Sequence, residues 1–228
     1  KWLGQNKLLD YSYRIIFIPE TIGSITYLSL HYKEMREKII AGFNVSCVGD
    51  NRAYSYLPSR DGNTLSDKIA LHILKWTDSN FFKYTWLDRG SDERQYCSPG
   101  IDLPIASIFR TKYGEYPEYH TSLDNLEDVV TEEGLEGGYR VIKKALVAIE
   151  KNKKYRVSVL CEPQLSKRGL YPDLSVKKID TNISLMMNFI SLCDGYTSLL
   201  DIAESLNIPI WDLYGLVDKL KEHKLIRE

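Results

Sequence analysis

Residues 114–127, with the sequence GEYPEYHTSLDNLE, contain the side chains of this chain that are best suited to chemistry. Tyr116, Tyr119 and His120 lie among four acids, and a glycine and a proline break up any regular element. A helix-start signal follows at Ser122, so we expect His120 to end a loop and to project its imidazole into a cleft. A lone histidine is more often a cap or a surface residue, so this hypothesis needs support from the rest of the chain.

Two further acids follow segments that read as buried strands. Residues 12–19 (SYRIIFIP) end at Glu20, and residues 43–49 (FNVSCVG) end at Asp50. Open α/β sheets place their active sites at the carboxyl ends of strands. The plain alternatives are that Glu20 is a first-turn acid of the next helix and that Asp50 is a turn residue.

A polar loop, residues 89–96, precedes a further buried strand at 101–110, which leads directly into the histidine loop. This order could place Asp92 and Glu93 near His120 at one rim of a sheet. We expect this acid pair to bind a substrate amine, and Tyr116 and Tyr119 of the histidine loop to line the same substrate site.

The elements that must position these residues alternate between strand and helix, which predicts an α/β fold: a three-layer sandwich with a mixed, mostly parallel sheet. His72 falls in the apolar pattern of a predicted helix and is expected in the core. The glycines of residues 134–138 are expected to bend or interrupt a long helix. Strands are expected at 12–19, 43–49, 54–58, 82–87, 101–110 and 156–160, and helices at 25–38, 66–76 and 125–151.

Bulk composition describes an ordinary globular chain of 228 residues, 43% hydrophobic and 27% charged, with a formal net charge of −1. Nothing in that balance calls for nucleic acid or an anionic membrane. The four cysteines are scattered without a CxxC pair, which fits a reducing cytoplasm. The opening Lys1-Trp2-Leu3 resembles the tail of a helix, so we expect a fragment of a longer protein.

A second domain is expected after a linker. We predict domains at 1–163 and 177–228, joined by residues 164–176, with the smaller one a winged helix-turn-helix. Its helices are expected at 182–192, 198–206 and 210–223, and Leu225-Ile226 is expected to begin a wing strand. Residues 177–228 carry six basic and eight acidic side chains, a balance of −2. Phosphate contacts dominate affinity for DNA, so this charge favours a protein-contact or dimerisation module, with Trp211 and Tyr214 as contacts.

Three stretches together resemble the zinc-dependent aminopeptidase family, which includes glutaminyl cyclases and glutamate carboxypeptidases. The resemblance is narrower to its bacterial branch with a C-terminal winged helix, which is linked with polysaccharide biosynthesis. Ile15–Ser24 (IIFIPETIGS) is similar to the strand ending in Glu-Glu-x-Gly, and Ser91–Pro104 to the Ser-Asp-His segment. Tyr113–Asp124 (YGEYPEYHTSLD) is similar to the family's Tyr-x-x-x-His-Thr-x-x-Asp, the most specific of the three motifs.

This resemblance implies that His120 is a zinc ligand and that Glu20 is either the general base or a ligand. Zinc lowers the pKa of bound water and polarises the scissile carbonyl, and a nearby carboxylate takes the proton. Asp50 is the acid nearest to the family's later ligand position, which Ser46 occupies here. Thr21 occupies a second ligand position. The implied cofactor is one zinc ion, which this fragment could lack.

The family's first histidine and bridging aspartate precede the Glu strand and have no counterpart in this chain. We therefore expect an incomplete catalytic domain, inactive alone, of a hydrolase that cleaves a peptide or a small amide. The alternative is a scaffold without metal, whose winged helix binds a protein partner or a second copy. A DNA-binding regulator is disfavoured by the charge of the C-terminal domain.

Overall fold

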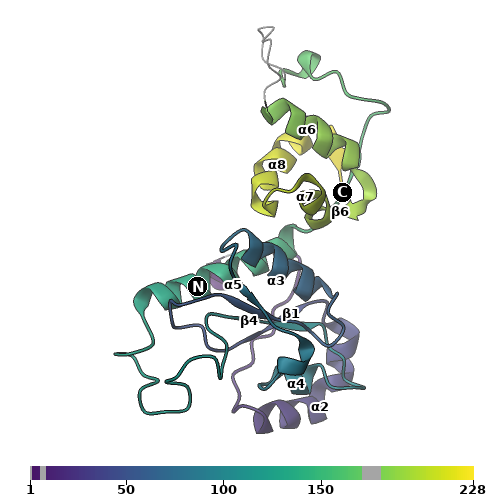
Figure 1. The fold of residues 1–228 in the computed structure, drawn as a ribbon. Helices are drawn as coiled ribbons and strands as arrows, with labels where there is room; N and C mark the ends of the chain where they lie inside the picture. The colour runs from purple at the N-terminus through teal and green to yellow at the C-terminus, as the bar shows by residue number, and fades with distance from the viewer. Residues whose placement is uncertain (1, 6–8, 171–180) are drawn as a thin grey trace. The chain divides into compact units, whose positions relative to one another are not determined.

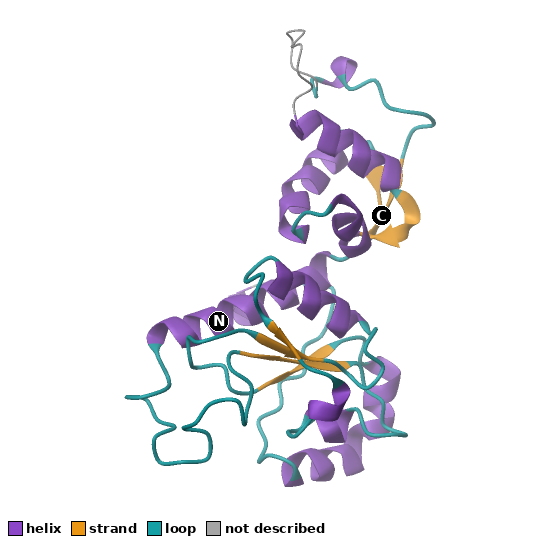
Figure 2. Cartoon of the chain, in the orientation of Figure 1, coloured by secondary structure: helices purple, strands orange, loops and turns teal. Residues whose placement is uncertain are grey.

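A computed structural model describes the chain except for residues 1, 6–8 and 171–180. The chain divides into two compact units, Lys1–Ile149 and Glu150–Glu228, and each is described by itself. Figures 1 and 2 show the elements of both units. Among the described residues, no helix is both long enough and apolar enough to cross a membrane.

A four-stranded mixed sheet forms the centre of the first unit, in the order β1-β4-β2-β3. The strands are β1 (Gly42–Val45), β2 (Ser55–Leu57), β3 (Phe82–Lys83) and β4 (Ile105–Phe109). β4 pairs in parallel with β1 and antiparallel with β2, and β2 pairs in parallel with β3. All five residues of β4 are buried, as expected for a central strand covered on both faces.

Helices cover both faces of this sheet. They are α1 (Trp2–Gln5), α2 (Ile22–Lys38), α3 (Leu65–Lys75), α4 (Glu93–Tyr96) and α5 (Glu132–Lys151), with a 3-10 helix at Trp86–Asp88. Figure 1 shows α3 and α5 on one side of the sheet and α2 and α4 on the other. The expected α/β architecture of three layers with a mixed sheet is therefore confirmed.

The start of α3 shows how this packing is fixed locally. Thr64 caps the helix in a capping box with Asp67, so α3 begins one residue before the start that we expected at residue 66. The hydroxyl of Ser66 instead donates to the carbonyl of Pro104 at 2.6 Å and accepts from the N–H of Gly42 at 2.8 Å. This hydroxyl joins α3 to both parallel strands. His72 is buried, as expected.

The glycines of α5 do not bend it: the helix runs without a break through Gly134, Gly137 and Gly138. A Cβ on Gly134 would lie 2.0 Å from the carbonyl oxygen of Gly49, and one on Gly138 would lie 2.6 Å from that of Val48. The three glycines share one helix face by their spacing. They allow α5 to approach the loop after β1 more closely than any side chain would permit.

The prediction of a buried strand at residues 12–19 is wrong for this structure, because these residues join neither sheet. Ile16 and Ile18 pack against a core cluster beside α2, whereas Ile15 is 64% exposed and Phe17 is 94% exposed. The segment is apolar on both faces, but the described residues cover only one of them. The pattern of residue types therefore suggested more burial than the segment has.

Among its described residues, the second unit combines a three-stranded antiparallel sheet with three α-helices. The strands, in the order β6-β5-β7, are β5 (Lys154–Val157), β6 (Asp194–Ser198) and β7 (Ile226–Arg227). The helices are α6 (Thr181–Leu192), α7 (Leu199–Leu206) and α8 (Tyr214–Glu222), with 3-10 helices at Ser166–Arg168 and Ile210–Leu213. β5, which we expected to end the first domain, belongs to this second sheet because both of its edges pair with strands of the C-terminal unit. Part of the expected linker, 171–176, lies outside the described residues.

The predicted helices of the C-terminal unit are confirmed, with the turn after α7 formed by Asn207 in a left-handed conformation. Ile202, Leu213 and Leu220 are fully buried where the helices meet. Tyr214 is half-buried, and this burial raises the pKa of its phenol. The predicted wing strand is confirmed as β7.

Candidate functional site

The turn that carries Glu20 is strained. Glu20 is exposed, and Thr21 next to it has φ 60° and ψ −67°, a conformation that a β-branched residue rarely adopts. The N–H of Thr21 donates to Oδ1 of Asp92 at 2.7 Å, and Arg94 donates to Oγ1 of Thr21 at 2.7 Å. Ser24 donates to the same oxygen of Asp92. Contacts from the first turn of α4 thus hold the turn beside Glu20 in place.

These contacts engage one carboxylate oxygen of Asp92, because its Oδ1 accepts two hydrogen bonds from the start of α2. The expectation that Asp92 binds a substrate amine stays a prediction. That expectation rested on an acid in a polar loop. Such an acid can accept hydrogen bonds from the protein's own backbone and side chains as readily as from a ligand.

The same expectation for Glu93 disagrees with the structure, because its side chain is completely buried. Its Oε1 accepts from the N–H groups of Gly90 and Ser91 at 2.8 and 2.9 Å and from the hydroxyl of Tyr113 at 2.8 Å. Its Oε2 accepts from the side chain of Asn44 in β1 at 2.9 Å. Burial, followed by the charge of Glu93, raises the pKa of Tyr113. Glu93 joins three segments of the interior and presents no oxygen to a substrate.

Asp50 is also buried and its oxygens are occupied. Thr111 donates to both of them, through its hydroxyl at 2.6 Å and its N–H at 2.9 Å, and the N–H of Arg52 donates at 3.0 Å. This arrangement fixes the loop after β1 to the end of β4. The expectation that Asp50 is a metal ligand is therefore not supported by its geometry, which matches the turn-residue alternative.

The histidine loop is anchored by an ion pair two residues before His120. The guanidinium of Arg52 contacts both carboxylate oxygens of Glu118, at 2.8 and 2.9 Å. This pairing lowers the pKa of the Glu118 carboxyl. Two charge-assisted bonds in parallel fix orientation as well as distance, so they restrain the segment that leads to His120.

His120 is exposed and has φ 59°, and its ring stacks on Tyr119 with 3.9 Å between ring centroids. Tyr119 contacts Tyr116 edge to face at 5.7 Å, and the hydroxyl of Tyr116 donates to Asp124 at 2.9 Å. Burial, followed by the bond to Asp124, raises the pKa of Tyr116. The loop thus forms an ordered aromatic surface on which the imidazole lies.

Tyr119 is where the distant segments meet. Its pKa is raised first by burial and then by nearby negative charge, to which Glu20 contributes. The charge of Glu20 thus acts on the residue on which His120 stacks, although Glu20 and Tyr119 are about one hundred positions apart in the chain. We call the surface around Tyr119 the rim. Asp50, Asp92 and Glu93 form hydrogen bonds within the unit.

Cys47 also lies beside Tyr119, and the sequence analysis did not predict it as a site residue. Its side chain packs with the aromatic cluster that includes Tyr119, and its thiol lies 3.7 Å from the hydroxyl of Ser46. Burial raises the pKa of this thiol. Its place in the sequence could have indicated this position, because Cys47 directly follows Ser46, which occupies a ligand position of the resembled family.

Within the described part of the chain, no three His, Cys, Asp or Glu side chains gather closely enough to hold a metal ion. A catalytic zinc site needs three protein ligands. The residues present therefore do not form a zinc site by themselves.

Two known families together match the whole chain. Residues 1–152 match the family described as Domain of unknown function (DUF4910), and residues 153–228 match the winged helix-turn-helix. Since the first match covers well over half of the chain, the chain belongs to the DUF4910 family, here joined to a C-terminal winged helix.

Named relatives specify the kind of domain. The chain is 39% identical over 219 residues to a Clostridium acetobutylicum protein called "Putative polysaccharide biosynthesis protein with aminopeptidase-like domain", covering 95% of this chain and 50% of that protein. It matches the crystal structure of a putative peptidase from the same organism with a TM-score of 0.88 at 35% identity, over 99% of this chain and 50% of the other. The first unit is therefore part of an aminopeptidase-like domain, and the chain spans about half the length of these relatives.

An aminopeptidase from Aneurinibacillus sp. strain AM-1 is more distant, with a TM-score of 0.45 at 20% identity over 57% of this chain and 30% of that chain.

Proposed function

We propose that the longer protein of which this aminopeptidase-like unit is a part hydrolyses a peptide bond or a small amide, with Glu20 as general base. Glu20 is exposed at a rim, follows an apolar segment and is held by a strained turn. A carboxylate in such a position can take the proton of an attacking water. His120, on the same rim, binds the substrate or polarises its scissile carbonyl.

The observation that supports this proposal concerns Tyr119. Burial and the charge of Glu20 act on the phenol of Tyr119, and the imidazole of His120 stacks on its ring. Among the described non-glycine residues, Thr21, Cys47 and His120 have positive φ angles at or beside this rim, and four others have them elsewhere. Strained residues cluster at active sites more often than elsewhere.

Zinc is part of the proposal only as an expectation from the family. The described residues do not form a three-ligand set, so no step of the reaction is assigned to a metal here. A zinc site in the longer protein would need ligands besides those of this chain.

The test is hydrolysis of an aminoacyl-p-nitroanilide series by the full-length protein, together with its zinc content. Glu20→Gln should lower kcat by about 100-fold or more with the fold intact, because a general base contributes roughly that factor. His120→Ala should lower kcat, and it should also lower bound zinc if His120 is the ligand that the family resemblance implies, whereas His223→Ala, in the second unit, should change neither. Wild-type activity that Glu20→Gln leaves unchanged would contradict the proposed base.

A second candidate function is a scaffold that has lost its metal. It is favoured by Thr21, whose hydroxyl accepts from Arg94 at 2.7 Å, and by Ser46, since neither can replace a carboxylate ligand. On this hypothesis the winged helix of residues 153–228 binds a protein partner or a second copy. A full-length protein without stoichiometric zinc and without activity on any substrate of the series would support the scaffold.

A further inference from the structure

The turn that carries His120 begins at Glu118 and has an unusual backbone. The carbonyl oxygen of Glu118 accepts from the N–H of Thr121 at 3.0 Å and from the hydroxyl of the same residue at 2.7 Å. These bonds close a four-residue turn in which His120 is the third residue, with φ 59°. A positive φ at the third position of a turn favours glycine or asparagine. A histidine there persists only where surrounding contacts hold it.

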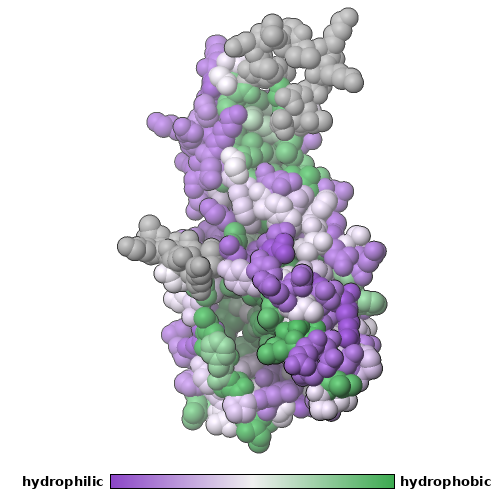
Figure 3. Space-filling model, turned by 90° about the vertical axis from the view of Figure 1, so that its left-hand side faces the viewer, coloured by the Kyte–Doolittle hydropathy of each residue, from purple (hydrophilic) through white to green (hydrophobic). Residues whose placement is uncertain are grey.

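Arg52 holds the first residue of this turn from another segment of the chain. Its guanidinium donates to both carboxylate oxygens of Glu118, at 2.8 and 2.9 Å, and lies 5.9 Å from the centre of the Tyr116 ring. Figure 3 shows hydrophilic residues at many places on the surface of the first unit, and most ion pairs at a protein surface contribute little. A bidentate pair is the exception, because its two parallel bonds also fix the direction of the carboxylate.

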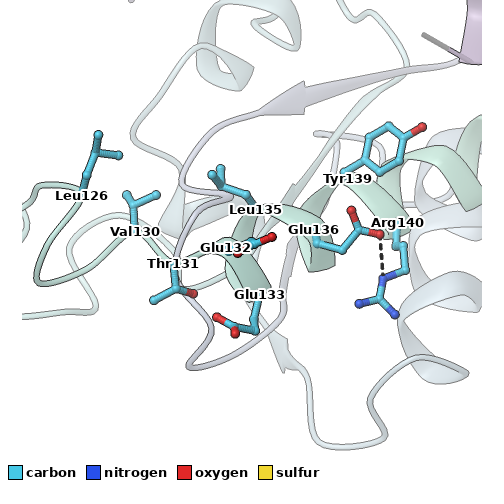
Figure 4. A pocket seen from close by; sticks show the side chains of 9 residues that line it. All are labelled: Leu126, Val130, Thr131, Glu132, Glu133, Leu135, Glu136, Tyr139 and Arg140. Atoms are coloured by element: carbon cyan, nitrogen blue, oxygen red, sulfur yellow. Dashed lines mark ion pairs between the residues drawn. The ribbon is translucent and has the colours of Figure 1, made fainter.

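Arg52 is itself anchored to the interior. Its backbone N–H donates to Oδ1 of Asp50 at 3.0 Å, and Asp50 is only 4% exposed. Thr111, just after β4, donates its hydroxyl and its N–H to the same carboxylate at 2.6 and 2.9 Å. The N–H of Thr131 donates to the carbonyl of Gly49 at 2.9 Å, and Figure 4 shows Thr131 where the chain enters α5. The loop after β1 is therefore fixed to both β4 and α5.

These contacts form one continuous path from the sheet to His120. The path runs from Thr111 through Asp50 to Arg52, and then through Glu118 to the turn. We propose that Arg52 is a positioning residue, which holds His120 through Glu118 in the conformation that serves the reaction. This inference rests on the proposed hydrolysis, in which His120 acts on the substrate. Arg52 acts only through Glu118, so its loss matters only as far as His120 moves.

Hydrogen exchange measured by mass spectrometry on the full-length protein tests the first step without any need for activity. Arg52→Gln should speed exchange of the N–H groups of Tyr119 and Thr121, which donate within this loop, by about tenfold or more, because the loop opens more often. Arg52→Lys keeps the charge but cannot form two parallel bonds, so its effect should be intermediate. Arg60→Gln is the matched control, because Arg60 forms an exposed ion pair with Asp102 at 2.6 Å, and it should leave this exchange unchanged.

Kinetics of aminoacyl-p-nitroanilide hydrolysis test the consequence for the reaction. Arg52→Gln should lower kcat by roughly 10–100-fold, because a misplacement of about 1 Å can cost that much. Glu118→Gln should give the same loss, and the double variant should lose no more than either single variant. In the His120→Ala background, Arg52→Gln should change kcat by less than about twofold, because the two residues act as one unit. A general structural role of Arg52 would lower kcat further in that background.

Unchanged exchange in Arg52→Gln, or a loss of kcat that persists in the His120→Ala background, would overturn the proposal. If Arg52→Gln leaves kcat intact while Glu20→Gln lowers it, this inference fails and the proposed hydrolysis stands. A wild-type protein without activity would remove the hydrolysis and with it the role of Arg52 in the reaction. Exchange would still show in that case whether Arg52 holds the turn, so the two failures can be told apart.

Discussion

Asp92 accepts a hydrogen bond at 2.7 Å from the backbone N–H of Thr21, across 71 positions of sequence. The bond joins the beginning of α4 to a turn whose φ of 60° no β-branched residue prefers. Strain of this kind persists only when surrounding contacts fix it. The position of Glu20, one residue earlier, therefore depends on an acid that belongs to a distant segment of the chain.

Replacing Asp92 tests this dependence. Asp92→Ala should lower the free energy of unfolding by roughly 1–3 kcal/mol, because it leaves the N–H of Thr21 and the hydroxyl of Ser24 without their acceptor. Urea denaturation measures the loss, and amide hydrogen exchange at residues 20–24 should increase. Asp61→Ala, at an exposed loop position, is the control and should stay within about 0.5 kcal/mol of wild type. Unchanged exchange at residues 20–24 would refute the role of Asp92.

Glu93 should be far more sensitive to substitution than its place in a polar loop suggests. Glu93→Ala removes the acceptor for four donors in a fully buried site and should cost about 3 kcal/mol or more. Glu93→Gln keeps the shape but turns one acceptor into a donor, so its cost should be intermediate. Glu37→Ala on the exposed side of α2 is the matched control. A stability of Glu93→Ala equal to that of Glu37→Ala would contradict the buried role.

The sequence predicted the layers and most elements of both units because their signals are local. Apolar runs, a capping box and turn residues depend on near neighbours, and β4 and α3 formed where those signals lie. The strand at 154–157 was assigned to the wrong sheet because its residue types suit either one. Its partners, β6 and β7, lie about 40 and 70 positions further along the chain.

The candidate site was predicted only in outline. Glu20 and His120 are both exposed, but Glu20 does not follow a strand as we expected, and the roles of both residues stay predictions. The burial of Glu93 and Asp50 was not predicted, because an acid that will be buried and an acid that will bind a ligand have the same side chain. Only the donors around them distinguish the two, and those donors come from distant segments such as Thr111 and Asn44.

The four thiols should differ in reactivity. Burial raises the pKa of Cys97 to about 11 and that of Cys193 to about 12, whereas Cys161 is exposed. A disulfide reagent at pH 8 should modify Cys161 rapidly and Cys47 more slowly, and the two buried thiols only on unfolding, because the thiolate is the reactive form. Cys161→Ser should remove the fast phase and is the check. A fast phase that persists in Cys161→Ser would contradict this order.

The same thiols predict a dependence of stability on pH. An unfolded thiol has a pKa of about 8.5, below the folded values of Cys97 and Cys193. The folded state therefore keeps these protons to higher pH. The contribution of the two protonated thiols to the free energy of unfolding is complete below about pH 8.5 and is lost as the pH rises toward their pKa values in the folded state. Denaturation midpoints should fall across this range. Cys97→Ala should reduce that fall, and a fall of the same size in this variant would rule out Cys97 as its source.

The glycines of α5 make the last prediction, in which helix propensity and packing oppose each other. Alanine favours a helix interior over glycine by about 1 kcal/mol, so propensity alone predicts that Gly138→Ala stabilises the protein. A Cβ there would lie 2.6 Å from the carbonyl oxygen of Val48 and 3.0 Å from its Cβ, and a backbone oxygen cannot move aside cheaply. We expect a net loss of roughly 1–3 kcal/mol, as for overpacking elsewhere.

Gly215→Ala in α8, where a Cβ would meet nothing within 4 Å, is the matched control and should stabilise by a fraction of a kcal/mol. Thermal denaturation of the two variants should therefore give shifts of opposite sign, and a stabilising shift for Gly138→Ala would mean that α5 can move away from the loop after β1 at little cost.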